Sequence, residues 1–148
     1  RKISGSAFQC SPLKTVIFQP DSKLYSIGSD SFTSLNIEKI SIPKKTVEIE
    51  RYAFLKSKKL KEIEISPDSS LKKIGSCAFS STSIIEIYFP KKVVNLENSA
   101  FDSCSELKKV VFDSEIELNS IEYSTFAYTS IRHLCLPKSI SDIKQNSF

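Results

Sequence analysis

The stretch that decides the fold is Leu71-Lys-Lys-Ile-Gly-Ser-Cys-Ala-Phe79, in which two apolar residues precede a short run of small residues that ends in phenylalanine. The same ending occurs seven times along the chain, at Phe8, Phe32, Phe54, Phe79, Phe101, Phe126 and Phe148. Successive members are separated by 24, 22, 25, 22, 25 and 22 residues. Self-similarity at such a period is the sequence signature of repeat proteins. The alternating spacing indicates that two kinds of turn are paired into a unit of about 47 residues.

Between successive phenylalanines the chain repeats the pattern Leu/Ile-x-x-Ile/Val-x-Phe/Ile, for example at Leu60, Ile63 and Ile65. Its last part alternates with period two, which is typical of a short strand whose first and third side chains point inward. The predicted strand segments lie within residues 13–18, 37–42, 60–65, 84–89, 107–112 and 131–136. A second, shorter apolar pair such as Leu71 and Ile74 follows each of them. Because no single turn can bury its own apolar face, the turns must stack, and one strand per turn then gives a parallel sheet.

Composition limits the classes of partner. The 148 residues are 40% hydrophobic and 26% charged, which is ordinary for a folded chain. The apolar runs, such as residues 16–18, are far shorter than the roughly 20 residues that cross a bilayer, so this segment is not expected to insert into a membrane. The net charge is only +4, and the lysines stand beside carboxylates instead of alternating with aromatic residues on one face. We therefore expect a protein partner and no nucleic acid.

The opening stretch resembles the BspA-like, Treponema-type subclass of leucine-rich repeats, together with Ile87-Tyr-Phe-Pro90-Lys-Lys-Val-Val94 and Ala100-Phe-Asp-Ser-Cys104-Ser-Glu-Leu-Lys108. The resemblance covers residues 1–148, although the glycine after the second apolar residue survives only at Gly28 and Gly75. It implies a leucine-rich-repeat solenoid, a right-handed coil of the α/β type that is mostly β and loop. We expect about six turns of alternating 22 and 24–25 residues, with a parallel sheet of about six short strands on the concave face.

The resemblance also implies a function. Members of the family are best known as cell-surface proteins of mucosal bacteria and protist parasites, linked to adhesion to host matrix proteins and cells. It implies a non-catalytic, adhesin-like protein-binding module that is on the cell surface or secreted. The alternative is a cytoplasmic structural scaffold packed into a larger protein assembly, which cysteines without disulfide partners favour. Because neither end carries a polar cap, we expect residues 1–148 to be an uncapped segment of a longer array.

The cysteines do not predict a metal site or a disulfide. Cys10, Cys77, Cys104 and Cys135 are separated by 67, 27 and 31 residues, with no Cys-x-x-Cys pair and one histidine in the chain. Cys10 and Cys104 hold equivalent positions four turns apart, about 19 Å at about 4.8 Å per strand, whereas a disulfide needs Cα atoms within about 7 Å. We expect buried or half-buried free thiols.

No constellation in the sequence predicts an enzyme. His133 and Cys135 share a predicted strand face, but no orienting third group follows from the register. There is no phosphate-binding glycine loop and no nucleophile motif. The sequence therefore predicts no catalytic residue, no cofactor and no metal ligand.

The candidate binding residues are those that the predicted strands point outward. Stacking the turns gives one column of Thr15, Lys39, Glu62, Glu86, Lys109 and His133, and a second of Ile17, Ser41, Glu64, Tyr88, Val111 and Cys135. From these we predict a partner-binding concave face made of Glu62, Glu64, Glu86, Tyr88, Lys109, Val111 and His133. Tyr88 is the expected anchor because it offers a large ring and a hydroxyl for one directed hydrogen bond.

The same residues also have interpretations that involve no binding. The apolar strip of Tyr88, Val111 and Cys135 also fits simple β-propensity. The acidic group of Glu62, Glu64 and Glu86 could receive a partner's lysine or arginine, or be a solvated face, and Glu62 opposite Glu86 should cost stability unless a lysine answers it. A lysine ridge of Lys44, Lys45, Lys91, Lys92 and Lys138 lies along one edge, and its simplest role is solubility.

Overall fold

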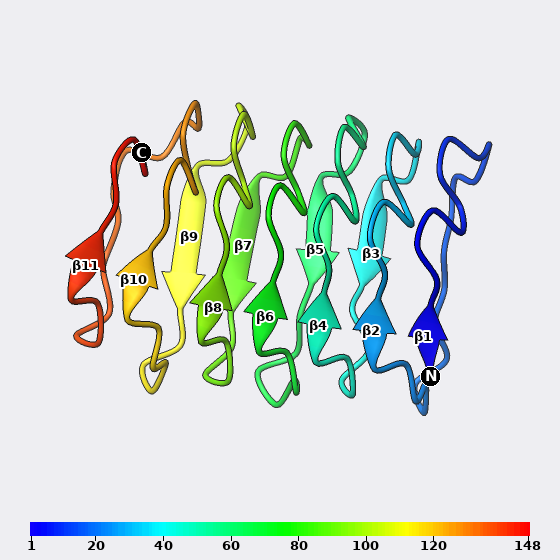
Figure 1. Ribbon diagram of the computed structural model, residues 1–148, viewed down its shortest axis with the longest axis horizontal. Coiled ribbons are helices and arrows are strands. Elements are labelled where there is room, and N and C mark those ends of the chain that lie inside the picture. The colour runs from blue at the N-terminus through cyan, green and yellow to red at the C-terminus, as the bar shows by residue number, and fades with distance from the viewer.

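The computed structural model describes all residues 1–148 and shows a coil of short parallel strands joined by turns, without a helix (Figure 1). The strands are β1 (Lys2–Ile3), β2 (Ser26–Ile27), β3 (Lys39–Ser41), β4 (Glu48–Ile49), β5 (Glu62–Glu64), β6 (Lys73–Ile74), β7 (Glu86–Phe89), β8 (Asn95–Leu96), β9 (Lys109–Phe112), β10 (Ser120–Ile121) and β11 (Asp142–Ile143). No helix in the structure has the length and apolar content needed to cross a membrane. The solenoid predicted from the sequence is confirmed, but its irregular connections contain no helical turn of the α/β kind.

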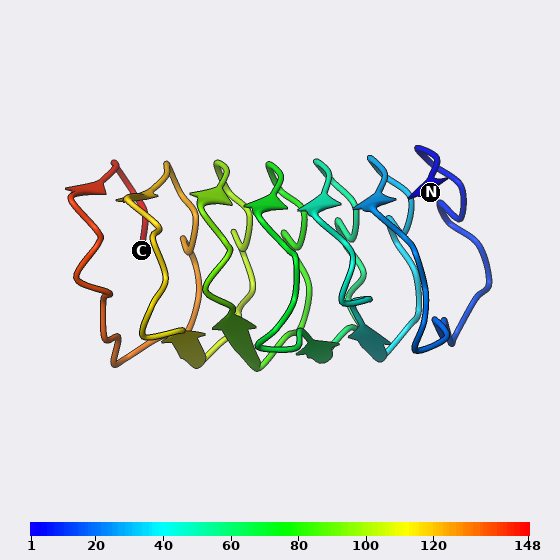
Figure 2. The ribbon, with the colours of Figure 1, turned by 90° about the horizontal axis from the view of Figure 1, so that it is seen from below.

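The strands lie in two rows on opposite sides of the coil (Figure 2). One row is a five-stranded parallel sheet in the order β1-β2-β4-β6-β8, continued by the separate pair β10-β11. The other row consists of two parallel pairs, β3 with β5 and β7 with β9. Between the pairs, just before β5 and β7 begin, the Ile85 N–H donates to the Lys61 carbonyl at 3.2 Å. The sequence pattern predicted the second row and missed the first, because two-residue strands such as Lys73–Ile74 are too short to show alternation.

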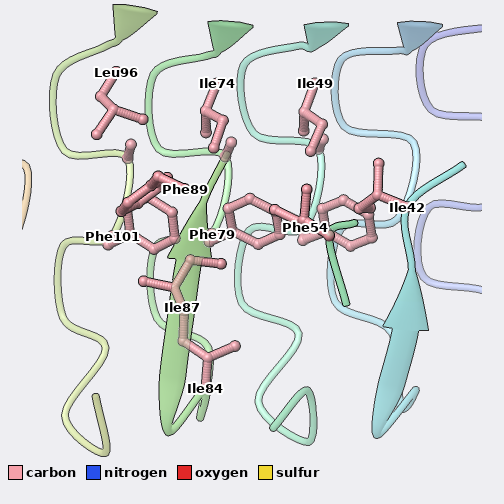
Figure 3. Packing of buried hydrophobic residues seen from close by; sticks show 14 of the residues in the cluster. Ile42, Ile49, Phe54, Ile74, Phe79, Ile84, Ile87, Phe89, Leu96 and Phe101 are labelled. Carbon is pink, nitrogen blue, oxygen red and sulfur yellow. The ribbon is translucent and has the colours of Figure 1, made fainter. Parts of the chain in front are cut away.

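The seven repeated phenylalanines stack in one column, as the spacing predicts. Successive ring centroids lie 5.3, 5.1, 5.0, 5.3, 5.5 and 5.7 Å apart from Phe8 to Phe148. Figure 3 shows Phe54, Phe79 and Phe101 side by side along the coil, under Ile49, Ile74 and Leu96. The five internal rings have no exposed surface. The column is therefore the centre of the hydrophobic core.

Backbone hydrogen bonds between turns hold this column in register. The Phe54 N–H donates to the Ala78 carbonyl at 2.7 Å, and the Phe79 N–H donates to the Ala100 carbonyl at 2.9 Å. The residues two before and two after each internal phenylalanine have positive φ, as at Cys77 (54°) and Ser81 (59°). Such left-handed residues turn the chain sharply on both sides of the ring, at a cost of roughly 1 to 2 kcal/mol each that the buried ring offsets.

The predicted sheet of six strands on one face is wrong in number, because residues 13–18 and 131–136 form no strand and the remaining four split into pairs. The physical reason is a proline that directly follows the strand segment in every second turn. Where β7 pairs with β9, the N–H of Asp113 donates to the Phe89 carbonyl at 2.9 Å. Pro90 stands at the matching position of its own turn and has no N–H to donate to the preceding turn.

The same proline recurs at the other breaks in this row. Pro43, Pro90 and Pro137 each follow the last apolar residue of a strand segment, 47 residues apart. The ladder is absent at every step that leads into one of these turns: residues 13–18 to β3, β5 to β7, and β9 to residues 131–136. The two-turn unit seen in the phenylalanine spacing is therefore also the unit of strand pairing in this row.

Candidate partner-binding face

The outward side chains of β3, β5, β7 and β9 form what we call the strand-pair face. Within the first pair Lys39 lies opposite Glu62 and Ser41 opposite Glu64. Within the second pair Glu86 lies opposite Lys109 and Tyr88 opposite Val111, so that the predicted columns are formed within each pair. Six of the seven predicted binding residues lie on this face: Glu62, Glu64, Glu86, Tyr88, Lys109 and Val111.

Lysines answer the acidic residues of the strand-pair face. The Lys39 ammonium lies 3.2 Å from the Glu62 carboxylate and 2.6 Å from that of Glu64. A hydrogen bond from Lys39, and then one from Ser41, lowers the pKa of Glu64 below its ordinary value. On the second pair, Lys109 lies 3.2 Å from Glu86. Since Lys39 is shared by two carboxylates, the first pair keeps one negative charge in excess.

The like charges that the sequence places on adjacent strands meet at the split between the pairs. Glu62 is on β5 and Glu86 on β7, between which no strand ladder forms. Their lysine partners, Lys39 and Lys109, lie on the far strand of each pair. Repulsion between facing like charges disfavours pairing, so these carboxylates and the proline act in the same direction.

Tyr88 is half-buried at the edge of the split, and its hydroxyl is already used. The Tyr88 hydroxyl donates to a carboxylate oxygen of Asp113 at 2.6 Å. Partial burial, followed by this hydrogen bond, raises the pKa of Tyr88 to about 12. The expectation of a hydroxyl open to a partner is therefore wrong, whereas the ring, fixed by that bond, remains available beside Val111.

A hollow of about 680 Å³ lies over the split and the ends of the strands. Its floor contains Ile42, Ile63, Ile65 and Ile87, and its rim contains Glu64, Glu86, Tyr88, Lys109 and Val111. Ile63 is the inward residue of β5 and is only partly buried, whereas the matching Ile40 and Ile87 are 1% and 2% exposed. The apolar pattern does not predict this floor, although the prolines at 47-residue intervals carry the signal for it.

His133 lies outside this arrangement. It is exposed in a stretch that forms no strand, and β9 has no ladder partner beyond it. The prediction that His133 lies next to Lys109 on a neighbouring strand is therefore wrong, because residues 131–136 form no strand that pairs with β9. The reason is again the proline step, here into Pro137. Cys135 is exposed in the same stretch.

All four cysteines are free, but only two have the predicted burial. Cys104 is buried, and its thiol donates to the Phe79 carbonyl at 3.1 Å. Burial raises the pKa of Cys104 to about 11. Cys77 is half-buried, whereas Cys10 and Cys135 are exposed because both lie in end turns with little to cover them. No group of three or more histidine, cysteine or acidic residues is placed to hold a metal ion.

Two residues of the lysine ridge form ion pairs with acidic residues of this chain. Lys44 lies 2.8 Å from Asp68 of the next turn, and Lys91 lies 3.0 Å from Glu115. Lys45, Lys92 and Lys138 form no ion pair. Lys44 and Lys91 therefore each link their own turn to the next one through an ion pair.

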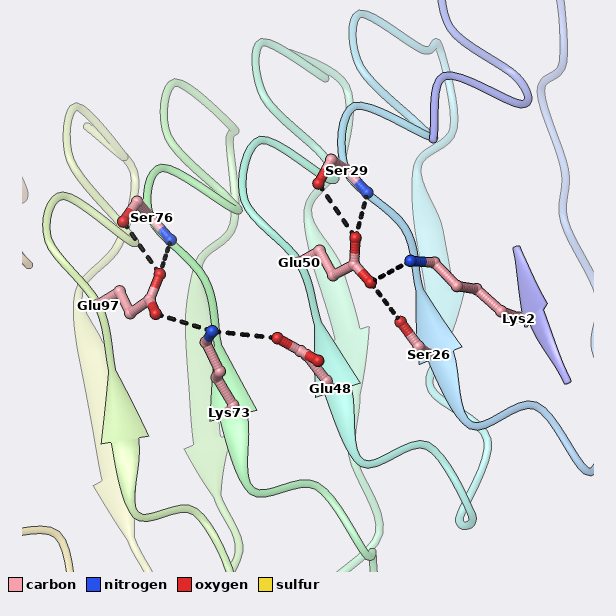
Figure 4. Close-up of polar contacts among 8 residues, drawn as sticks. All are labelled: Lys2, Ser26, Ser29, Glu48, Glu50, Lys73, Ser76 and Glu97. Carbon is pink, nitrogen blue, oxygen red and sulfur yellow. Dashed lines mark hydrogen bonds and ion pairs between the residues drawn. The ribbon is translucent and has the colours of Figure 1, made fainter. Parts of the chain in front are cut away.

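The opposite, five-stranded sheet satisfies its charges internally (Figure 4). Lys73 bridges Glu48 at 3.1 Å and Glu97 at 2.9 Å. The Glu50 carboxylate accepts hydrogen bonds from both Ser26 and Ser29 and pairs with Lys2. Partial burial opposes its ionisation, but hydrogen bonds from Lys2, Ser26 and Ser29 outweigh burial and lower the pKa of Glu50 to about 2. These contacts hold turns together, and the hollow of about 340 Å³ beside them is lined only by polar residues: Ser76, Asn95, Glu97, Asn98 and Glu122.

Three solved structures illustrate what this chain is similar to. The pneumococcal vaccine antigen PcpA shares 28% identity and a TM-score of 0.77, over 84% of this chain and 33% of that protein. A leucine-rich cell surface protein of Faecalibacterium prausnitzii shares 22% identity and a TM-score of 0.57, over 84% of this chain and 40% of that protein. The leucine-rich repeat protein TpLRR of T. pallidum shares 17% identity and a TM-score of 0.52, over 98% of this chain and 62% of that protein. The latter two likenesses concern the fold alone.

This chain spans about a third of the length of the pneumococcal antigen. Comparison with curated proteins gives no match. The family description "BspA type Leucine rich repeat region" matches residues 1–61 and 25–148, in six copies that together cover the chain. With the phenylalanine column and the stacked turns already described, this match shows that the chain belongs to the BspA-type leucine-rich repeat family.

Proposed function

We propose that this chain is a non-catalytic, protein-binding module of an adhesin-like surface protein, and that it contacts host or matrix proteins through the strand-pair face. The observation that carries the proposal is the hollow over the β5–β7 split, which is bounded by charged side chains and by the rings and methyl groups of Tyr88 and Val111. The residues proposed to meet the partner are Glu62, Glu64, Glu86, Tyr88, Lys109 and Val111, with His133 at the margin.

Rigidity supports binding at this face. A binding residue must be free to contact the partner and yet held in place by its surroundings. Val111 is 37% exposed but belongs to a strand that is hydrogen-bonded to β7. Tyr88 keeps its ring half-exposed while its hydroxyl is fixed on Asp113. Half-buried, rigidly held aromatic side chains of this kind often contribute strongly to the free energy of binding at protein interfaces.

An accessible, surface or secreted location is supported by the pneumococcal relative, which is a vaccine antigen. The alternative of an intracellular scaffold is favoured by the exposed free thiols of Cys10 and Cys135, since exposed thiols persist more readily in a reducing compartment. Labelling of intact cells with a membrane-impermeant reagent separates the two: labelled protein supports the surface role, and protein labelled only after lysis supports the scaffold.

Binding can be tested with beads that carry the chain and with immobilised extracellular-matrix proteins or epithelial cells. The double variant Tyr88→Ala, Val111→Glu should reduce binding about tenfold or more, because interface anchors commonly contribute 2 kcal/mol or more. The matched control Tyr25→Ala, Val94→Glu changes residues that are 56% and 50% exposed beside the opposite sheet, and should leave binding intact.

Two outcomes would contradict the proposal. If the double variant folds, as judged by circular dichroism, and binds as well as the unmodified chain, the strand-pair face is not the binding face. If the unmodified chain binds none of the matrix proteins or cells, the adhesin-like role is wrong.

A further inference from the structure

Resting on that proposed function, we propose that the hollow over the β5–β7 split takes an extended segment of the partner in which apolar side chains alternate with basic ones. The inference goes beyond protein binding in general, because it names the sequence pattern that the partner's segment must have.

The dimensions of the hollow fit an extended peptide that crosses the strands. Its lining runs from Phe18 in the first turn, past Ile42, Ile65 and Tyr88, to Val111 in the fifth. Four steps of about 4.8 Å give a length of about 19 Å, which about six extended residues span at roughly 3.3 Å each. Alternate side chains of such a segment face the floor, and the others face the rim.

The floor favours apolar side chains. It consists largely of isoleucine, and the partly exposed Ile63 offers apolar surface that the coil itself does not cover. The Ile65 N–H also has no acceptor in the protein, whereas the matching Ile42 N–H donates to the Glu64 carbonyl at 2.8 Å. A peptide carbonyl can accept that hydrogen bond, which an apolar side chain alone would leave unmade.

The rim favours basic side chains. Both lysines that line the hollow, Lys44 and Lys109, are already paired, Lys44 with Asp68 at 2.8 Å and Lys109 with Glu86 at 3.2 Å. Lys39 serves Glu62 and Glu64 together, so the carboxylates beside the hollow outnumber the ammonium groups available to them. An arginine of the partner would restore the balance and can bind a carboxylate through two N–H groups. An acidic segment would meet no unpaired cation there.

The probe for this inference is a set of six-residue, end-blocked peptides in which valine alternates with arginine, with glutamate or with serine. Each is titrated into the ¹⁵N-labelled chain and followed by amide shifts. The arginine peptide should bind most tightly, with shifts concentrated at residues 63–66 and 86–88. Glu64→Gln with Glu86→Gln should weaken its binding roughly threefold to tenfold, since two exposed ion pairs with the peptide are lost. Glu106→Gln, which changes an exposed carboxylate outside the hollow, is the matched control and should have no effect.

The inference is overturned if the glutamate peptide binds as tightly as the arginine peptide, if the shifts lie elsewhere, or if no peptide binds. If the Tyr88→Ala, Val111→Glu variant still loses matrix binding, the proposed function survives that failure. Conversely, a peptide that binds in the hollow while this variant keeps full matrix binding supports the inference and contradicts the proposed function.

Discussion

Replacing Phe79 with alanine removes the middle ring of the phenylalanine column. The ring has no exposed surface and stacks on Phe54 at 5.0 Å and on Phe101 at 5.3 Å. Loss of a buried phenylalanine costs about 3 to 5 kcal/mol, which includes the cavity that is left. Each aromatic pair adds about 0.5 to 1.5 kcal/mol, so the upper half of that range is expected.

The matched variant is Phe8→Ala. Phe8 is 38% exposed and stacks on one neighbour only, Phe32 at 5.3 Å, so its loss should cost about 1 to 2 kcal/mol. Urea unfolding of both variants, followed by circular dichroism, measures the difference. Because each turn contacts only its neighbours, Phe79→Ala should also broaden the transition by uncoupling the two halves of the coil. Equal costs for the two variants, or a cost under about 1 kcal/mol at Phe79, would refute the buried column.

Three further predictions follow from the turns. The folded pKa of Glu50 is about 2 and its ordinary value is 4.5, so its stabilisation is present above pH 4.5 and is lost as the pH falls towards 2. Glu50→Gln should therefore lower the free energy of unfolding by about 1 to 3 kcal/mol at neutral pH. The same variant should make the free energy of unfolding depend less on pH between 4.5 and 2. Gly75→Ala should cost about 2 kcal/mol or more in thermal unfolding, because the new Cβ would lie 2.5 Å from the Arg51 nitrogen; an unchanged Tm would contradict the packing. A thiol reagent should modify Cys135 at once and Cys104 only on unfolding, since burial raises the pKa of Cys104 to about 11; equal rates would contradict its burial.

The core could be predicted from the sequence because its signal is strong and repeated. A phenylalanine at the same position of every turn can be buried only if the turns stack in register, and each ring from Phe32 to Phe126 is fully buried. The outward columns followed for the same reason, since alternation along a strand fixes which side chains face out. Lys39 opposite Glu62 and Tyr88 opposite Val111 are formed as the register requires.

The candidate site was harder to predict because it depends on where the ladder fails. A pattern of apolar residues shows which segments can pair but not which neighbouring pairs lack a donor, and that depends on single residues such as Pro90. The use of the Tyr88 hydroxyl by Asp113, 25 residues away in sequence, depends on the conformations of two side chains that no periodicity describes. The lysines that answer Glu62 and Glu86 were foreseeable as a requirement, but their identity needed the structure.

The proposed binding site, the hollow over the β5–β7 split, requires that no strand ladder joins β5 to β7, and amide hydrogen exchange tests that most directly. The Ile42 N–H donates to Glu64 across an intact ladder, whereas the Ile65 N–H faces the split and has no acceptor in the protein. In the free chain, the Ile65 amide should exchange at least about fivefold faster than the Ile42 amide, because a hydrogen bond contributes about 1 kcal/mol or more to protection. Equal protection of the two amides would show that the ladder continues from β5 to β7, and would contradict the hollow as the binding site.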